Sequence, residues 1–275
     1  MFSLLSPSNI FHLIEKLISF INSIFFILFL IALSFALIFS PPDYLQGDSV
    51  RIMYVHVPSA WIGLASFTCI ALLSIANFIF KTKNLIIITK SIAPIGLMFT
   101  CLAIITGSLW GQPTWGTWWA WDARLTSMVI LALFYIGYIV SHKLILNEER
   151  ANKISSIIAI IGLINIPIIK FSVDWWNTLH QPASIKLTGT STIHSSMLMP
   201  LLLMFFVLLL YCALIFLMKY KTEIIRMKKK KLKKIMIQNF LYMNGYGLFV
   251  WASFSITLFS CAIVFYKAQK TLKKY

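Results

Sequence analysis

Acidic residues are scarce in this chain of 275 residues: it has 8 Asp and Glu against 24 Lys and Arg, and only 12% of its residues are charged. Hydrophobic residues make up 59%, and long uncharged runs recur along the chain. A soluble domain does not need such runs, whereas helices that face lipid do. The runs are continuous rather than alternating, which argues against a transmembrane β-barrel. The sequence therefore predicts an all-α polytopic membrane protein.

The usual signs of a catalytic site are also missing. The four cysteines lie within apolar runs and form no CxxC pair, so neither a disulfide framework nor a thiol-redox site is indicated. We find no nucleophile–base pair and no Gly-rich phosphate loop. The first apolar run is too long for a cleavable signal peptide, so we expect it to stay as a spanning helix. An enzyme is not expected.

Six apolar runs predict six membrane spans, at residues 17–40, 57–80, 85–109, 125–141, 154–171 and 194–218. Pro167 is expected to kink the fifth span, and the sixth contains Pro200. A seventh apolar run covers 245–266. We therefore predict a six-span unit at 1–218, a basic cytoplasmic linker at 219–243 and a single-span segment at 244–275.

Basic residues are unevenly shared between the two sides of these spans. One side holds most of them, including the lysine-rich run after the sixth span, whereas the other holds only Arg51, Arg124, Lys170 and Lys186. The positive-inside rule then places the N-terminus in the cytoplasm and the alternate connections outside the inner membrane. Because the basic clusters flank spans, they indicate contact with the lipid bilayer, and no nucleic-acid partner is expected.

The stretch 109–127, LWGQPTWGTWWAWDARLTS, contains five of the nine tryptophans and lies on the outer side. Trp115, Trp118, Trp119 and Asp122 are spaced i, i+3, i+4, i+7, which predicts three indoles and a carboxylate on one helical face. A flat apolar wall with a polar edge suits a large planar ligand. The alternative is a tryptophan belt at the membrane interface.

Three further tryptophans are predicted to lie in the same outer layer: Trp61, Trp175 and Trp176. Eight of the nine tryptophans would then share one side of the membrane. A belt should appear at both interfaces, so this asymmetry favours a ligand site.

The histidines divide into two groups. His12 and His142 are predicted at cytoplasmic ends, where we expect them to be solvated and without a role. His56 and His180 fall in the two outer connections that flank the tryptophan stretch, and His194 is close enough to be a fallback. Two imidazoles above and below a planar tetrapyrrole would complete an octahedral iron. Each would need an acceptor at its second nitrogen to fix its tautomer.

Haem also carries two propionates, which guanidinium groups bind well. Arg124 and Arg51 are candidate partners, and Lys186 is a weaker one. Two alternatives stay open here. Arg124 could instead pair with Asp122 or cap a helix, and Asp122 could be the N-cap of the following span.

Three segments, WGTWWAWDARLTS, MYVHVPSAW and WWNTLHQ, resemble the tryptophan-rich WWD signature and the two histidine segments of the haem exporter protein C (CcmC) family. The resemblance covers about residues 10 to 220. It implies that haem b is presented on the outer, periplasmic face and loaded onto the haem chaperone CcmE, and that CcmA and CcmB, an ABC-type pair, help to release the chaperone. It implies axial ligation by His56 and His180. It implies a platform of Trp115, Trp118, Trp119, Trp121 and Asp122.

The tail, MNGYGLFVWASFSITLFSCAIVFYKAQKTLKKY, resembles CcmD, a one-span protein of the same assembly. A fusion of two subunits is the interpretation that this favours. The linker lysines and the tail lysines Lys267, Lys270, Lys273 and Lys274 both prefer the cytoplasm, which a single span cannot satisfy. Either the last helix points opposite to a free CcmD or the two pieces are separated in the cell.

Two other functions are alternatives to haem handling. A b-type electron-transfer cytochrome usually has its paired histidines inside spans, whereas both candidates here are predicted in loops. A permease subunit of a transporter for haem or a small molecule would be expected to carry charge or broken half-helices near the membrane midplane. The predicted spans lack such charge, although Pro94, Pro167 and Pro200 could kink them.

Overall fold

The computed structural model describes residues 7–182 and 193–272, and this part of the chain is helical apart from its turns and one isolated β-bridge. It forms two compact units, Met1–Glu223 and Ile224–Tyr275. The long helices are α1 (Pro7–Ser34), α2 (Met53–Phe80), α3 (Lys83–Trp115), α4 (Ala123–Leu144), α5 (Glu148–Leu163), α6 (Asn165–Trp175), α7 (Ser195–Tyr242) and α8 (Gly247–Leu272). Short helical turns are η2 (Phe35–Phe39), η3 (Asp48–Ile52) and η4 (Met243–Gly245).

Six helical segments are long and apolar enough to cross a membrane, which confirms the predicted all-α fold with six spans. They are Phe11–Phe39, Asp48–Phe80, Asn84–Trp115, Ala123–Leu144, Glu148–Trp175 and Ser195–Gly245. A continuous helix satisfies its own backbone hydrogen bonds, which lipid cannot do. The helices extend beyond several predicted ends, because hydropathy marks the lipid-facing part of a helix and not its caps.

The fifth span is broken where a proline requires it. Ile164 separates α5 from α6, and its amide donates to the carbonyl of Ile161 at 3.1 Å. Pro167 has no N–H to donate to the carbonyl of Leu163, so the regular ladder cannot continue through this turn. The predicted kink is confirmed. Pro200, six residues into α7, leaves that helix unbroken.

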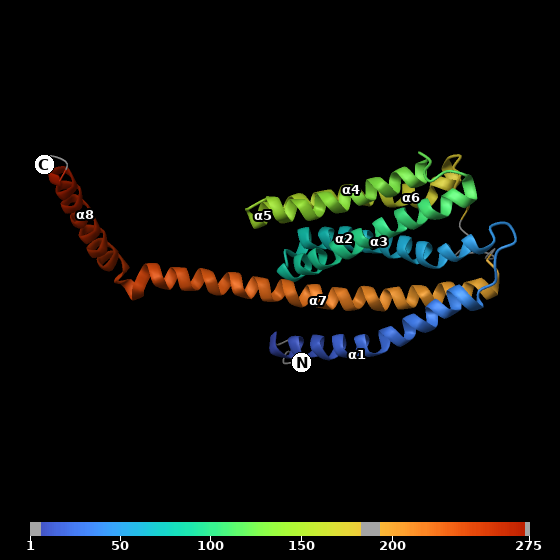
Figure 1. The fold of residues 1–275 in the computed structure, drawn as a ribbon, viewed down its shortest axis with the longest axis horizontal. Helices are drawn as coiled ribbons and strands as arrows, with labels where there is room; N and C mark the ends of the chain where they lie inside the picture. The colour runs from blue at the N-terminus through green and yellow to red at the C-terminus, as the bar shows by residue number, and fades with distance from the viewer. Residues whose placement is uncertain (1–6, 183–192, 273–275) are drawn as a thin grey trace. The chain divides into compact units, whose positions relative to one another are not determined.

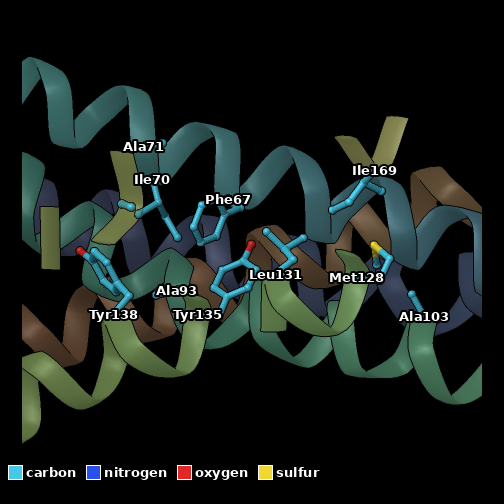
Figure 2. Close-up of a cluster of buried hydrophobic side chains, with 11 residues drawn as sticks. Phe67, Ile70, Ala71, Ala93, Ala103, Met128, Leu131, Tyr135, Tyr138 and Ile169 are labelled. Carbon is cyan, nitrogen blue, oxygen red and sulfur yellow. The ribbon is translucent and has the colours of Figure 1, made fainter. Parts of the chain in front are cut away.

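The core of the first unit lies between α2, α3, α4 and the α5–α6 pair (Figure 2). Tyr135 of α4 is fully buried, and its hydroxyl donates to the carbonyl of Gly63 at 2.7 Å. Gly96 leaves room for the same ring, since a Cβ there would collide with the Tyr135 hydroxyl. Burying this phenol without an acceptor would be costly. The contact therefore fixes how α2, α3 and α4 are aligned along their length.

A second cluster joins α1 and α7 to the outer part of α2. Ala32 of α1, Leu201 and Met204 of α7 and Tyr54 of α2 are buried in it, and the Tyr54 hydroxyl bonds to Ser40. Figure 1 shows α1 beside the first part of α7, with α2 and α3 between them and α4. The consequence for the site is that α2, α4 and α7 begin, and α3 and α6 end, at one end of the bundle.

The second unit consists of the end of α7 and the helix α8, joined by a turn. The basic segment predicted as a linker continues α7 to Tyr242, where η4 turns the chain with Asn244 and Gly245 at φ +53° and +96°. The rings of Phe240 and Trp251 pack edge to face, with centroids 5.0 Å apart. The predicted seventh helix is present as α8, although its apolar stretch, Gly247–Ile263, is shorter than the six spans. The tail residues Lys273 and Lys274 lie outside the described residues.

Candidate functional site

The tryptophan stretch does not form one helical face, so that prediction is wrong. α3 ends at Trp115, and Gly116 adopts a left-handed conformation with φ +74°, its amide donating to the carbonyl of Gln112 at 3.0 Å. A glycine in this position is a common helix stop. α4 then begins after Asp122, whose Oδ1 accepts from the amide of Leu125 at 2.8 Å. Asp122 is therefore the N-cap, as one of the open alternatives predicted.

The segment between these two helices folds back over the end of α3. The Ser108 hydroxyl donates to the carbonyl of Trp118 at 2.7 Å, and the Thr117 hydroxyl donates to that of Trp119 at 3.0 Å. Gly111 leaves space for the Trp115 ring, because a Cβ there would lie 2.9 Å from its Cε3. The indoles are thus arranged by turns and local hydrogen bonds rather than by helical periodicity.

Two indoles of this segment present large apolar surfaces to the outside. Trp118 and Trp121 are 58% and 80% exposed. Trp119 packs edge to face against Trp121, with ring centroids 5.5 Å apart. The Trp119 Nε1 and the Asp122 Oδ2 are both buried without a hydrogen-bond partner among the described residues. The segment therefore offers an apolar surface with one unused donor and one unused acceptor.

His56 lies in the first turn of α2 rather than in a loop, near the start of the span. Its Nδ1 is 2.9 Å from the carbonyl of Ala103 and 3.3 Å from the hydroxyl of Thr106. A carbonyl only accepts, so Nδ1 carries the proton and the Nε2 lone pair is left for a metal. Gly107 makes room for this ring, because a Cβ there would lie 2.8 Å from its Cε1.

His180 lies in the connection between α6 and α7. Its Nδ1 is 3.0 Å from the Arg124 Nη1, a donor, and 2.8 Å from the carbonyl of Gln181, an acceptor. The Trp115 ring is 6.2 Å from the imidazole, centroid to centroid. Burial lowers the pKa of His180, and the positive charge of Arg124 lowers it further. The neutral imidazole, which is the form that binds metals, is therefore favoured.

Arg124 ties the His180 connection to α6. Besides contacting His180, its guanidinium donates to the carbonyls of Ile169 at 3.3 Å and Lys170 at 3.1 Å. No ion pair joins Arg124 to Asp122 in the described structure. The alternative that these two residues form a local pair is therefore wrong. Arg124 thus contacts two backbone carbonyls in the middle of α6 and an imidazole at the same time.

The two histidines predicted as ligands are brought to the same end of the bundle. Arg124 lies at this end as well, in the first turn of α4, and contacts His180 directly. His56 comes from α2 and His180 from a connection more than a hundred residues later, so only the packing of α2, α3, α4 and α6 unites them.

A family model described as Heme exporter protein C matches residues 1–235. Heme exporter protein C of Bradyrhizobium diazoefficiens is 40% identical over 208 residues, which are 76% of this chain and 79% of that protein. The Haemophilus influenzae protein of the same name is 36% identical over 225 residues, 82% of this chain and 92% of its own length. A putative cytochrome c biosynthesis ccmC-like mitochondrial protein of Arabidopsis thaliana is 40% identical over 226 residues, 81% and 84% of the two chains.

The chain belongs to the haem exporter protein C family. It is accordingly a multi-pass membrane protein of cytochrome c biogenesis, in a family that handles haem and does not consist of enzymes. All the site residues described above lie within the part that the haem exporter protein C model matches, whereas α8 lies beyond it.

Other residues considered from the sequence have different surroundings. Arg51 pairs with Asp48 at 3.2 Å and donates to the carbonyl of Ser40 at 3.3 Å. The His194 Nδ1 bonds to the Ser196 hydroxyl at 2.7 Å at the start of α7. Lys186 lies outside the described residues.

The two histidines that were predicted at cytoplasmic ends differ from each other. His12 is exposed, as predicted, but both ring nitrogens of His142 are buried without a partner among the described residues. The prediction that His142 is solvated was wrong. Its ring packs against Tyr138 at 5.0 Å, because α2, α3 and α5 close around this end of α4. The described side chains around it leave no cavity that could hold a tetrapyrrole.

Sequence reasoning missed the residues that orient the imidazoles. Thr106 and Gly107 lie beside His56. Gln181 follows His180, and Gln46 donates a hydrogen bond to Gln181. A glycine two residues before the tryptophan stretch was a usable signal for a ring packed against α3. The glutamines carry no spacing signal, because their partners come from distant segments.

Proposed function

We propose that this protein binds haem b as cargo at the outer end of its six-helix bundle and loads it onto the haem chaperone CcmE. The iron would lie between His56 and His180. The observation that carries the proposal is the His56 imidazole, whose Nδ1 is committed to Ala103 and whose Nε2 is therefore ready to bind iron. A second neutral imidazole, His180, lies at the same end of the bundle.

The residues around these imidazoles fit haem. The apolar faces of Trp118 and Trp121 are exposed on the segment between α3 and α4, at the same end of the bundle, and would cover part of the porphyrin. The unused Trp119 N–H is a donor suited to a propionate oxygen. Arg124 supplies a positive charge for the same group, and Trp115 and Asp122 complete the platform that the family resemblance implies.

The orientation that we propose places the N-terminus in the cytoplasm and the tryptophan segment in the periplasm, in the inner membrane. The uneven distribution of Lys and Arg supports it. In this orientation the haem site faces the periplasm, where CcmE would receive the haem.

We also propose that CcmA and CcmB are partners in releasing loaded CcmE and that residues 244–275 act as a fused CcmD-like segment. The sequence pattern of the tail and the single apolar helix α8 support the latter. Haem handling by residues 1–218 does not depend on this assignment, because the proposed ligands and platform all lie there.

The test is the spectrum and delivery of haem by purified full-length protein. Replacement of both His56 and His180 by alanine should abolish the spectrum of six-coordinate low-spin haem, and a pull-down with CcmE should lose its haem-dependent component. His12→Ala, which removes an exposed imidazole at the other end of the bundle, is the matched control and should behave as wild type. An unchanged haem spectrum in the double variant would refute the axial assignment.

A further inference from the structure

Gln46 connects the surroundings of the two proposed ligands. It lies in the connection between η2 and η3, outside the bundle core. Its Oε1 accepts from the Trp110 Nε1 at 2.9 Å, and its Nε2 donates to the Gln181 Oε1 at 3.3 Å. Trp110 belongs to α3, and Gln181 belongs to the connection between α6 and α7. One side-chain amide thus joins three segments that are distant in the sequence.

The orientation of this amide follows from its partners. An indole N–H can only donate, so the oxygen of Gln46 must face Trp110 and its nitrogen must face Gln181. The amide of Gln181 is in turn required to present its oxygen. Both amides are therefore fixed in one of their two orientations, which makes the link directional.

The connection that carries Gln46 is built to hold it still. The Asp43 Oδ1 accepts from the amides of Leu45 and Gln46, each at 2.9 Å. Two backbone hydrogen bonds, at 3.1 and 2.9 Å, close the loop between Asp43 and Gly47, which has φ +57°. The Ser49 hydroxyl donates to the carbonyl of Gln46 at 2.7 Å. Such a loop loses little conformational entropy when its side chain makes a contact.

Each partner of Gln46 contacts a proposed ligand. The Trp110 ring meets His56 edge to face, with centroids 5.7 Å apart and planes at 73°. Gln181 follows His180 directly, and its carbonyl lies 2.8 Å from the His180 Nδ1. An unbroken path of contacts therefore runs from His56 through Trp110, Gln46 and Gln181 to His180.

We propose that Gln46 is a positioning residue that sets how the two imidazoles face each other across the haem. The proposal rests on the proposed function, because it takes His56 and His180 as the ligands. Gln46 touches neither ligand directly. It acts by fixing the plane of the Trp110 ring against one imidazole and the connection next to the other.

The experiment uses full-length protein loaded with haem, and it compares Gln46→Ala with wild type. We measure the fraction of six-coordinate low-spin haem by absorbance and electron paramagnetic resonance, and the rate of haem transfer to excess apomyoglobin. Gln46→Ala should lose haem about tenfold faster, since two hydrogen bonds are lost, and should gain a five-coordinate high-spin component. Gln46→Glu keeps an acceptor for Trp110 and can accept from a turned Gln181 amide, so it should retain most of the low-spin signal.

The matched control is Gln112→Ala, which deletes an exposed amide from the outer end of α3 and should behave as wild type. If Gln46→Ala does not fold, Gln181→Ala and Trp110→Phe, which each remove one of the two hydrogen bonds, replace it. Adding Gln181→Ala to Gln46→Ala should cause little further loss, because both changes break the same path. Wild-type spectra and transfer rates in the Gln46→Ala variant, or in both replacements, would overturn the proposal.

Failure of the proposed function is distinguishable from failure of this inference. If the haem spectrum ignores His56→Ala and His180→Ala, the ligand assignment is wrong and the positioning role falls with it. If it depends on both histidines but not on Gln46, only the positioning role is wrong.

Discussion

At the scale of single residues, the two proposed ligands differ in how their Nδ1 atoms are used. The Nδ1 of His56 has only acceptors beside it, the carbonyl of Ala103 and the hydroxyl of Thr106, which itself donates to Leu102. The Nδ1 of His180 has the donor Arg124 on one side and the carbonyl of Gln181 on the other. When Arg124 donates to it, the proton sits on Nε2, which then cannot bind iron. His56 is thus fixed in the ligating tautomer. His180 adopts that tautomer only when its Nδ1 donates to the carbonyl of Gln181 and does not accept from Arg124.

Arg124 should therefore set the pH at which His180 dissociates from the haem iron. The protonated imidazole cannot bind iron, and the positive charge of Arg124 lowers the pKa of His180 by opposing that protonation. Arg124→Gln removes the charge, so the pKa rises and haem should be released at a higher pH during acidification. The measurement is the low-spin haem signal against pH. Lys170→Gln, which removes an exposed charge from neighbouring α6, should leave the curve in place, and a curve shifted to lower pH by Arg124→Gln would contradict the expectation.

At the scale of elements, the site depends on how closely α2 approaches α3. The His56 ring lies against the backbone of α3 at Gly107, and the acceptors of its proton belong to the preceding turn of that helix. The N-cap at Asp122 and the stop at Gly116 then determine where the tryptophan segment leaves α3 and where α4 begins. The ligand and the platform are thus positioned by the same helix end.

Gly107→Ala should disturb the haem site while leaving the bundle folded. The new Cβ would lie 2.8 Å from Cε1 and 3.3 Å from Nδ1 of His56, so the ring must move away from Ala103. Haem retention should fall about tenfold or more, because the tautomer and the direction of Nε2 are no longer fixed. The control is Gly137→Ala in α4, whose Cβ would make only ordinary contacts with Ile158 at 3.7 and 3.8 Å. Equal haem retention in both variants would argue against a tight fit of His56 on α3.

At the scale of the whole molecule, the chain consists of two compact units, and the haem exporter protein C match ends at residue 235. The proposed ligands, the tryptophan platform and Gln46 belong to the first unit. The basic end of α7 and the helix α8 form the second. On the proposed function, haem binding therefore depends on the first unit alone.

Removal of residues 244–275 should leave haem binding unchanged. The deleted segment contributes no residue to the proposed site, so the low-spin signal and the thermal unfolding of the remaining protein should match those of the full chain. If the segment acts as CcmD, release of loaded CcmE in the presence of CcmA and CcmB should slow instead. Loss of haem from the truncated protein would show that the second unit contributes to binding.

The helices, and the residues around which the site is built, could be predicted without knowing the packing. Long apolar runs in lipid must satisfy their own backbone, so the six spans follow from composition, and the Pro167 break follows from one missing N–H. The identity of the histidines and tryptophans carried the family resemblance. None of this required knowledge of which helices touch.

The contacts that orient those residues depend on packing between segments that are distant in the sequence. Helical spacing predicted a single face for Trp115, Trp118 and Trp119, but Gly116 with φ +74° ends the helix, and the indoles are placed by turns. The acceptor at the His56 Nδ1, the space at Gly107 and the link through Gln46 all come from segments far away in the sequence. Such contacts exist only once α2, α3, α4 and α6 have packed, because no local pattern encodes the partner of a side chain across a helix interface.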